Sequence, residues 1–121
     1  MKFVFLLAVS LAVVAAVEKY DTKNDDFDVA ALVADVEKLR QFTGCFLEKN
    51  PCNDISTAFK KDLGEAIQEA CAKCSAAQKN QMKLYLNGIQ EKTPQDYEEF
   101  KKKYDPENKY MVALNNALEN A

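Results

Sequence analysis

Apolar residues recur every three or four positions through most of the chain after residue 27, which is the spacing of a helix face. Residues that favour helix starts precede these stretches, and residues that break helices follow several of them. Asp28 can cap a short helix through Ala34, and Asn50 with Pro51 ends the next helical segment. The later helices have candidate starts at Asn53 or Asp54, at Ser75, and at Thr93 followed by Pro94.

The apolar positions of each segment fall on one side of the expected helix, so each helix is amphipathic. No stretch shows a sustained two-residue alternation, so no sheet is expected. The sequence therefore predicts an all-α fold, a compact bundle of about six short amphipathic helices. We call each set of apolar positions on one helix face a stripe; Gly64 lowers the helix propensity within the second one. The stripes are Val36, Leu39, Phe42 and Phe46; Ile55, Phe59, Leu63, Ile67 and Ala70; Met82, Tyr85, Leu86 and Ile89; Tyr97, Phe100 and Tyr104; and Tyr110 or Met111 with Leu114 and Leu118.

Residues 1–16 have the pattern of a removable secretory leader. Lys2 precedes an apolar run that is too short to span a bilayer, and the small residues Ala15 and Ala16 stand before Glu18. We therefore expect a signal peptide over residues 1–16 and a single domain over residues 17–121 that is secreted and extracellular. Residues 18–26 are polar and carry no apolar stripe, and we expect them to form an extended arm that leads passively into the first helix.

Four cysteines follow the leader, with six, eighteen and two residues between successive ones. In an oxidising compartment an even number predicts disulfides rather than a metal site or a catalytic redox pair. Of the three possible pairings, local geometry favours Cys45 with Cys52 and Cys71 with Cys74, because a turn at Pro51 returns the chain and residues three apart at a helix end lie within bonding distance. A zinc site is the weaker alternative, because the spacing of the two pairs is uneven.

Charge and composition exclude or disfavour several classes of function. Without Lys2 the chain has 15 basic and 19 acidic residues, a net charge of −4, which argues against nucleic acid and against anionic membranes. The chain has no histidine, so histidine-based triads and dyads are excluded. Carboxylate pairs are not excluded by composition, but among so many acidic residues any one pair is best read as a solvated face. We expect no catalytic residues, no cofactor and no resident metal.

The cysteine spacing and three other segments resemble the insect chemosensory proteins, also called the OS-D or A10 family. The resemblance covers nearly the whole of the expected domain. It departs at Tyr97, where the family usually has tryptophan, and at Phe42, where tyrosine is usual. The matching segments are Tyr20, Thr22, Lys23, Asp25, Asp28 and Val29; Cys45, Phe46 and Leu47 with Pro51 and Cys52; and Lys103, Tyr104, Asp105 and Pro106 with Tyr110.

This resemblance implies a six-helix soluble domain with disulfides between neighbouring cysteines and an internal apolar channel that carries small hydrophobic molecules. Fatty acids, alcohols, esters and pheromone-like volatiles are such ligands, and no catalysis is implied. The chain has twelve phenylalanines and tyrosines, two of them in the expected leader, which leaves enough apolar surface in the domain to line a cavity as well as a core. The expected walls, chosen by helical face and, for two of them, by family position, are Leu39, Phe42, Phe46, Leu63, Ile67, Tyr85, Tyr97 and Phe100.

The sequence thus favours a secreted, monomeric carrier of a small hydrophobic molecule that neither binds nucleic acid nor inserts into membranes. The alternative is a secreted interaction or developmental factor that acts through a protein partner, with bound lipid incidental. A membrane-perturbing protein of the saposin type is less well supported, because basic amphipathic faces are missing. An enzyme is the least supported class.

Overall fold

Helices make up most of the structure, a computed structural model that describes residues 18–121. The predicted leader, residues 1–16, lies outside the described residues. Within residues 18–121 there is no strand, which confirms the all-α prediction. The six helices are α2 (Val29–Ala34), α3 (Val36–Phe46), α4 (Asp54–Gln68), α5 (Ala76–Lys92), α6 (Pro94–Tyr104) and α7 (Met111–Leu118).

Side-chain caps explain where most of these helices begin. The Asp28 carboxylate accepts a hydrogen bond from the amide of Ala31 at the start of α2. Asn53, rather than Asp54, caps α4 and forms a reciprocal capping box with Ser56. A second capping box joins the side chains and backbones of residues 75 and 78 at the start of α5, and α6 begins at a proline. The starts therefore lie where the sequence predicts them.

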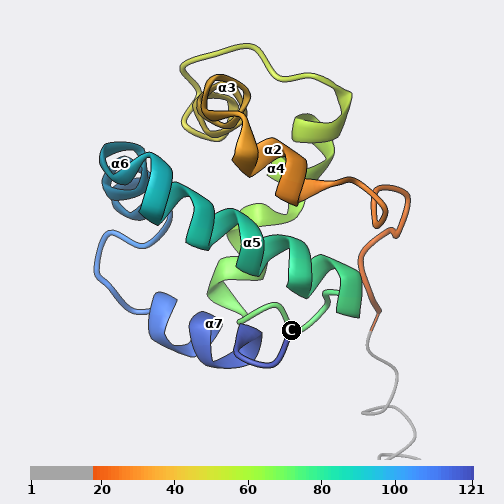
Figure 1. Ribbon diagram of the computed structural model, residues 1–121. Coiled ribbons are helices and arrows are strands. Elements are labelled where there is room, and N and C mark those ends of the chain that lie inside the picture. The colour runs from red at the N-terminus through yellow and green to blue at the C-terminus, as the bar shows by residue number, and fades with distance from the viewer. Residues whose placement is uncertain (1–17) are drawn as a thin grey trace, which may run out of the picture.

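The helix α5 runs through the centre of the bundle, with α2 and α7 on opposite sides and α6 packed against it (Figure 1). The helix α3 packs against α4 and α6 and so closes the bundle on a further side. Leu39, Ile67, Ile89, Phe100 and Leu114 are fully buried where these faces meet. No helix within residues 18–121 has both the length and the apolar character needed to cross a membrane.

Two disulfides close the corners on either side of α4. Cys45 pairs with Cys52 between α3 and α4, and Cys71 pairs with Cys74 between α4 and α5, with Cα–Cα distances of 5.0 Å in both. The second corner is tight because Ala70 and Cys71 adopt positive φ angles of 53° and 60°. The predicted local pairing is confirmed.

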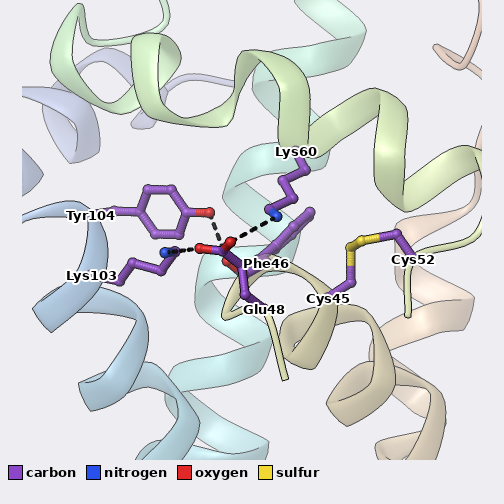
Figure 2. Close-up of polar contacts among 7 residues, drawn as sticks. All are labelled: Cys45, Phe46, Glu48, Cys52, Lys60, Lys103 and Tyr104. Atoms are coloured by element: carbon purple, nitrogen blue, oxygen red, sulfur yellow. Dashed lines mark hydrogen bonds and ion pairs between the residues drawn. A yellow bond between two sulfur atoms is a disulfide. The ribbon is translucent and has the colours of Figure 1, made fainter. Parts of the chain in front are cut away.

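Glu48 connects the first of these corners to two other helices (Figure 2). Its carboxylate forms ion pairs with Lys60 on α4 and with Lys103 on α6. Beside it, the Tyr104 hydroxyl donates a 2.8 Å hydrogen bond to the carbonyl of Phe46. These contacts join the end of α3 to α4 and α6, and exposed ion pairs of this kind stabilise a fold only slightly.

Candidate functional site

A pocket of about 270 Å³ lies where the arm, α2, α3, α4 and α5 meet, and apolar atoms dominate its wall. Exposed residues at positions 21, 23 and 61 are part of the lining, so the pocket reaches the surface. The lining is Tyr20, Asp21, Lys23, Asn24, Val29, Leu32, Phe42, Phe46, Ala58, Phe59, Lys61, Asp62, Leu63, Ala66, Cys74, Gln78, Gln81, Met82 and Tyr85.

Aromatic rings form one side of this pocket. Phe42, on α3, stacks on Phe27 with the ring centroids 5.7 Å apart and meets Phe46 edge to face at 5.3 Å. The ring of Phe59, on α4, lies 6.2 Å from that of Phe42, and the ring of Tyr85, on α5, lies 5.6 Å from that of Phe46. Such contacts fix ring orientations, so this side of the pocket has a definite shape.

Of the eight residues expected from sequence as walls, four line the pocket: Phe42, Phe46, Leu63 and Tyr85. They come from three helices, and all four are buried. Their common position shows that the apolar faces of α3, α4 and α5 converge here.

The other four expected residues do not line this pocket. Leu39, Ile67 and Phe100 have no exposed surface and belong to the closed core. Tyr97 is half-buried on α6, and the ammonium group of Lys101 lies 4.8 Å from the centre of its ring. The physical reason is that helical periodicity identifies an inward face but not which part of that face meets a cavity.

Several lining residues were not selected from the sequence. Phe59 and Met82 stand in the predicted stripes and are only half-buried, because each lies at the pocket. Val29 and Leu32 were part of a helix too short to show a stripe. Small residues complete the wall at Ala58 and Ala66 on α4.

The arm differs most from its expectation. It was expected to be a passive lead-in, but hydrogen bonds hold it to the bundle at several points, and it contributes four residues to the pocket. The amide of Tyr20 donates to the carbonyl of Lys73, and its hydroxyl donates to Oε1 of Glu65 at 2.7 Å. Nε2 of Gln78 donates to the carbonyl of Asp21 at 2.8 Å. The arm is therefore a bound cover over one side of the pocket.

Gln81, on α5, is the polar side chain that holds the centre of the arm. Its exposed fraction is only 7%. Its Nε2 donates to the backbone carbonyls of Asn24, Asp25 and Phe27 at 2.8, 3.2 and 3.2 Å. Its Oε1 is buried and has no hydrogen-bond partner among the described residues.

The pocket is neutral within and carries both signs of charge at its rim. Asp21 and Asp62 stand with Lys23 and Lys61 in the lining, and all four are exposed or half-buried. Deeper in the wall, burial raises the pKa of Tyr85, so its hydroxyl stays protonated at neutral pH. That hydroxyl lies 2.7 Å from Oγ1 of the buried Thr43.

This arrangement suits the binding of an apolar molecule. Among residues 18–121 no group of three histidine, cysteine, aspartate or glutamate side chains is placed to hold a metal ion. A predominantly apolar pocket with few polar groups is complementary to an apolar molecule with one polar end.

Comparison with known proteins identifies the family. Residues 20–112 match the family described as the insect pheromone-binding family, A10/OS-D. The chain belongs to this family. The match includes every pocket residue and both disulfides, so the OS-D assignment applies to the site as well as to the fold, and it confirms the resemblance drawn from the cysteine spacing.

Relatives of this OS-D protein are similar over nearly their whole length. Ejaculatory bulb-specific protein 3 of Drosophila melanogaster is 30% identical, over 92% of this chain and 89% of that protein. Allergen Tha p 1 of Thaumetopoea pityocampa is 31% identical, over 94% of each. A solved structure described as a chemosensory protein in complex with bromo-dodecanol has a TM-score of 0.73 at 22% identity, and covers 85% of this chain and 100% of that chain. At that identity the likeness shows the shared fold.

Proposed function

We propose that this protein is a secreted, monomeric carrier that holds a small hydrophobic molecule in the pocket beneath the arm. The observation that carries the proposal is the apolar, aromatic-walled pocket of about 270 Å³, which opens beside the arm and reaches the core. The OS-D family and the likeness to a chemosensory protein in complex with bromo-dodecanol support the same conclusion. No reaction is part of the proposal.

The pocket size favours a slender ligand. Pockets for drug-sized molecules have volumes of about 300–1,000 Å³, so about 270 Å³ suits a single aliphatic chain better than a ring system. Burying each methylene contributes roughly 0.8 kcal/mol, and association and chain ordering cost several kcal/mol. A chain of about twelve to fourteen carbons then binds with a free energy of roughly −6 to −8 kcal/mol, which corresponds to a dissociation constant of about 1 to 50 μM.

Displacement of a fluorescent lipid probe tests the proposal. The wild-type protein should bind one probe per chain, and an aliphatic alcohol should displace it. Phe59→Ala removes a ring from the wall while the half-buried position spares the closed core, so the affinity should fall several-fold with helical circular dichroism unchanged. Absence of displaceable binding in the wild-type protein would overturn the proposal and favour a role through a protein partner.

Tyr97→Ala makes the test specific to this pocket. The sequence expectation places Tyr97 in the wall and therefore predicts weaker binding for Tyr97→Ala, whereas Phe59 is not among the walls expected from the sequence. The Tyr97 ring lies on α6 beside the Lys101 ammonium group and is not part of the pocket lining. The proposed pocket therefore predicts a loss for Phe59→Ala and none for Tyr97→Ala, and the reverse result would move the site to α6.

A further inference from the structure

We propose that the pocket prefers ligands whose polar end donates a hydrogen bond, and that Oε1 of Gln81 is the acceptor. A long-chain alcohol is such a ligand, whereas an ether, an ester or a carboxylate is not. This inference rests on the proposed carrier function and adds the chemistry of the polar end. It makes Gln81 a residue that determines ligand specificity.

The orientation of the Gln81 amide follows from its surroundings. Three backbone carbonyl oxygens, two from the arm and one from Phe27 directly after it, lie within 2.8–3.2 Å of Nε2. An amide oxygen in that place would face three acceptors and form no hydrogen bond, so the NH₂ group must occupy it. The carbonyl oxygen is thereby directed away from the arm backbone, on a side chain that lines the pocket.

One residue of the pocket lining, Gln81, has a buried side-chain polar atom without a partner within residues 18–121, and that atom is an acceptor. Among the described residues, two buried side-chain polar atoms have no partner, Oε1 of Gln81 and Oδ1 of Asp25. They are neighbours in the hydrogen-bond network, because the Asp25 carbonyl accepts from the Gln81 amide. The Gln81 atom is an amide carbonyl oxygen, which can only accept, so a ligand in the pocket satisfies it by bringing an O–H or N–H group.

The charges of the wall disfavour an anionic head group. The pocket lysines, Lys23 and Lys61, are exposed at the rim, and none is buried near Gln81. A carboxylate drawn in to Gln81 would lose its hydration and meet acceptors instead of a cation. Ethers and esters have no O–H or N–H group and would leave the buried Gln81 oxygen unpaired. A buried acceptor discriminates strongly against such ligands, so ethers and esters are also disfavoured.

A pair of isomers isolates the hydroxyl hydrogen. Dodecanol and undecyl methyl ether have the same molecular formula and similar length, but only the alcohol can donate. The experiment measures both dissociation constants by probe displacement for the wild-type protein and for Gln81→Leu. Losing one hydrogen bond should weaken dodecanol relative to the ether by about fivefold to tenfold. A change that only loosens the arm would weaken both isomers together.

Gln90→Leu is the matched control. Gln90 lies on the same helix, is exposed and is outside the pocket lining, so the same substitution there should leave the ratio of the two constants unchanged. If both isomers bind the wild-type protein and Gln81→Leu does not change their ratio, the inference fails while the carrier function stands. If neither isomer binds the wild-type protein, the carrier function itself fails.

A second measurement covers the case in which Gln81→Leu does not fold. In the wild-type protein with bound dodecanol, nuclear Overhauser contacts should join the CH₂ group beside the hydroxyl to the side-chain amide protons of Gln81. Contacts from that CH₂ group to Lys23 or Lys61 in their place would put the head group at the rim and overturn the inference.

Discussion

The hydroxyl of Tyr20 donates a 2.7 Å hydrogen bond to Oε1 of Glu65, and this bond ties the start of the arm to α4. Burial and the bond to Glu65 raise the pKa of Tyr20, and the same bond lowers the pKa of Glu65. Both shifts favour a neutral phenol beside a charged carboxylate at neutral pH. Lys73 pairs with the second carboxylate oxygen of Glu65 at 3.4 Å. We call this set of contacts among Tyr20, Glu65 and Lys73 the clasp of the arm.

Tyr20→Phe removes this bond and keeps the ring in the pocket wall. We expect the arm to open more often, and a bound aliphatic ligand to dissociate roughly threefold to tenfold faster, because the lost bond has a charged partner and is partly exposed. Stopped-flow probe displacement measures the rate, and amide hydrogen exchange of residues 20–26 measures arm opening.

Tyr104→Phe is the control for loss of a tyrosine hydroxyl. It removes the bond to the Phe46 carbonyl in the corner of Figure 2, away from the arm. Arm exchange and ligand dissociation should match the wild-type protein. Equal dissociation rates for Tyr20→Phe and the wild-type protein would show that the clasp does not limit release.

Two glycines in helices should respond in opposite ways to alanine. At Gly64 in α4 a Cβ atom would meet nothing within 4 Å, so Gly64→Ala gains helix propensity of about 1 kcal/mol without a clash. At Gly88 in α5 a Cβ atom would lie 2.5 and 2.7 Å from the methyl groups of Val33 on α2, so Gly88→Ala should destabilise the fold. Urea unfolding of both variants checks the signs. A loss of stability in Gly64→Ala would mean that α4 is not regular at this point.

Asp105 stabilises the start of α7, which lacks a side-chain bond from its own N-cap residue. Its Oδ1 accepts from the amide of Lys109 at 2.7 Å, and its Oδ2 accepts from those of Tyr110 and Met111 at 3.1 Å. Burial raises the pKa of the Asp105 carboxyl, but the three backbone hydrogen bonds outweigh burial and leave the pKa below its usual value.

A carboxyl with a lowered folded pKa stabilises the protein above its unfolded pKa, about 3.9, and that contribution is lost as the pH falls through the folded value. We therefore expect Asp105→Asn to unfold at a lower temperature than the wild-type protein near neutral pH. The difference should shrink progressively below about pH 4. Glu107→Gln, at an exposed carboxylate in the same loop, should change the midpoint little at any pH. A difference for Asp105→Asn that does not vary with pH would contradict the capping role.

Binding of a neutral ligand should be nearly independent of pH between about 7.5 and 5.5. The chain has no histidine, the side chain whose unperturbed pKa, about 6.5, falls in that range. Carboxyl groups ordinarily titrate near 4, below the range. Titration of dodecanol at both pH values measures this, and a tenfold loss at the lower pH would reveal a carboxylate that gates the pocket.

The helices could be predicted because their signals are local. A cap such as Asn53 and a stripe such as Phe59, Leu63 and Ile67 need no knowledge of the rest of the chain. The pocket could be predicted only in part, because Phe59 and Ile67 share one helix face, yet Phe59 is half-buried at the pocket and Ile67 is fully buried in the core. That difference depends on how α4 meets other helices, and no periodicity encodes it.

No local sequence pattern predicts that the arm binds to the bundle. Its composition describes an extended polar segment, and the side chains that bind it lie 45 to 57 positions away. The carbonyl of Asp21 is bound by Gln78, and that of Asn24 by Gln81. Gln78 also belongs to the capping box at the start of α5, so it has a local role. Gln81 is buried on α5, and nothing in the sequence explains a polar residue there.

The helix α4 is flanked by a disulfide at each end, whereas the arm and α2 are held to α5 by noncovalent contacts. Both covalent rings are small, spanning sequence separations of 7 and 3, so neither restrains the distance between the arm and the rest of the bundle. The wall carrying Phe59 and Leu63 therefore lies on a helix cross-linked at both ends, whereas the arm and α2 are held to α5 only by hydrogen bonds and packing. We expect a longer or bulkier ligand to be accommodated by displacement of the arm and α2 rather than of α4.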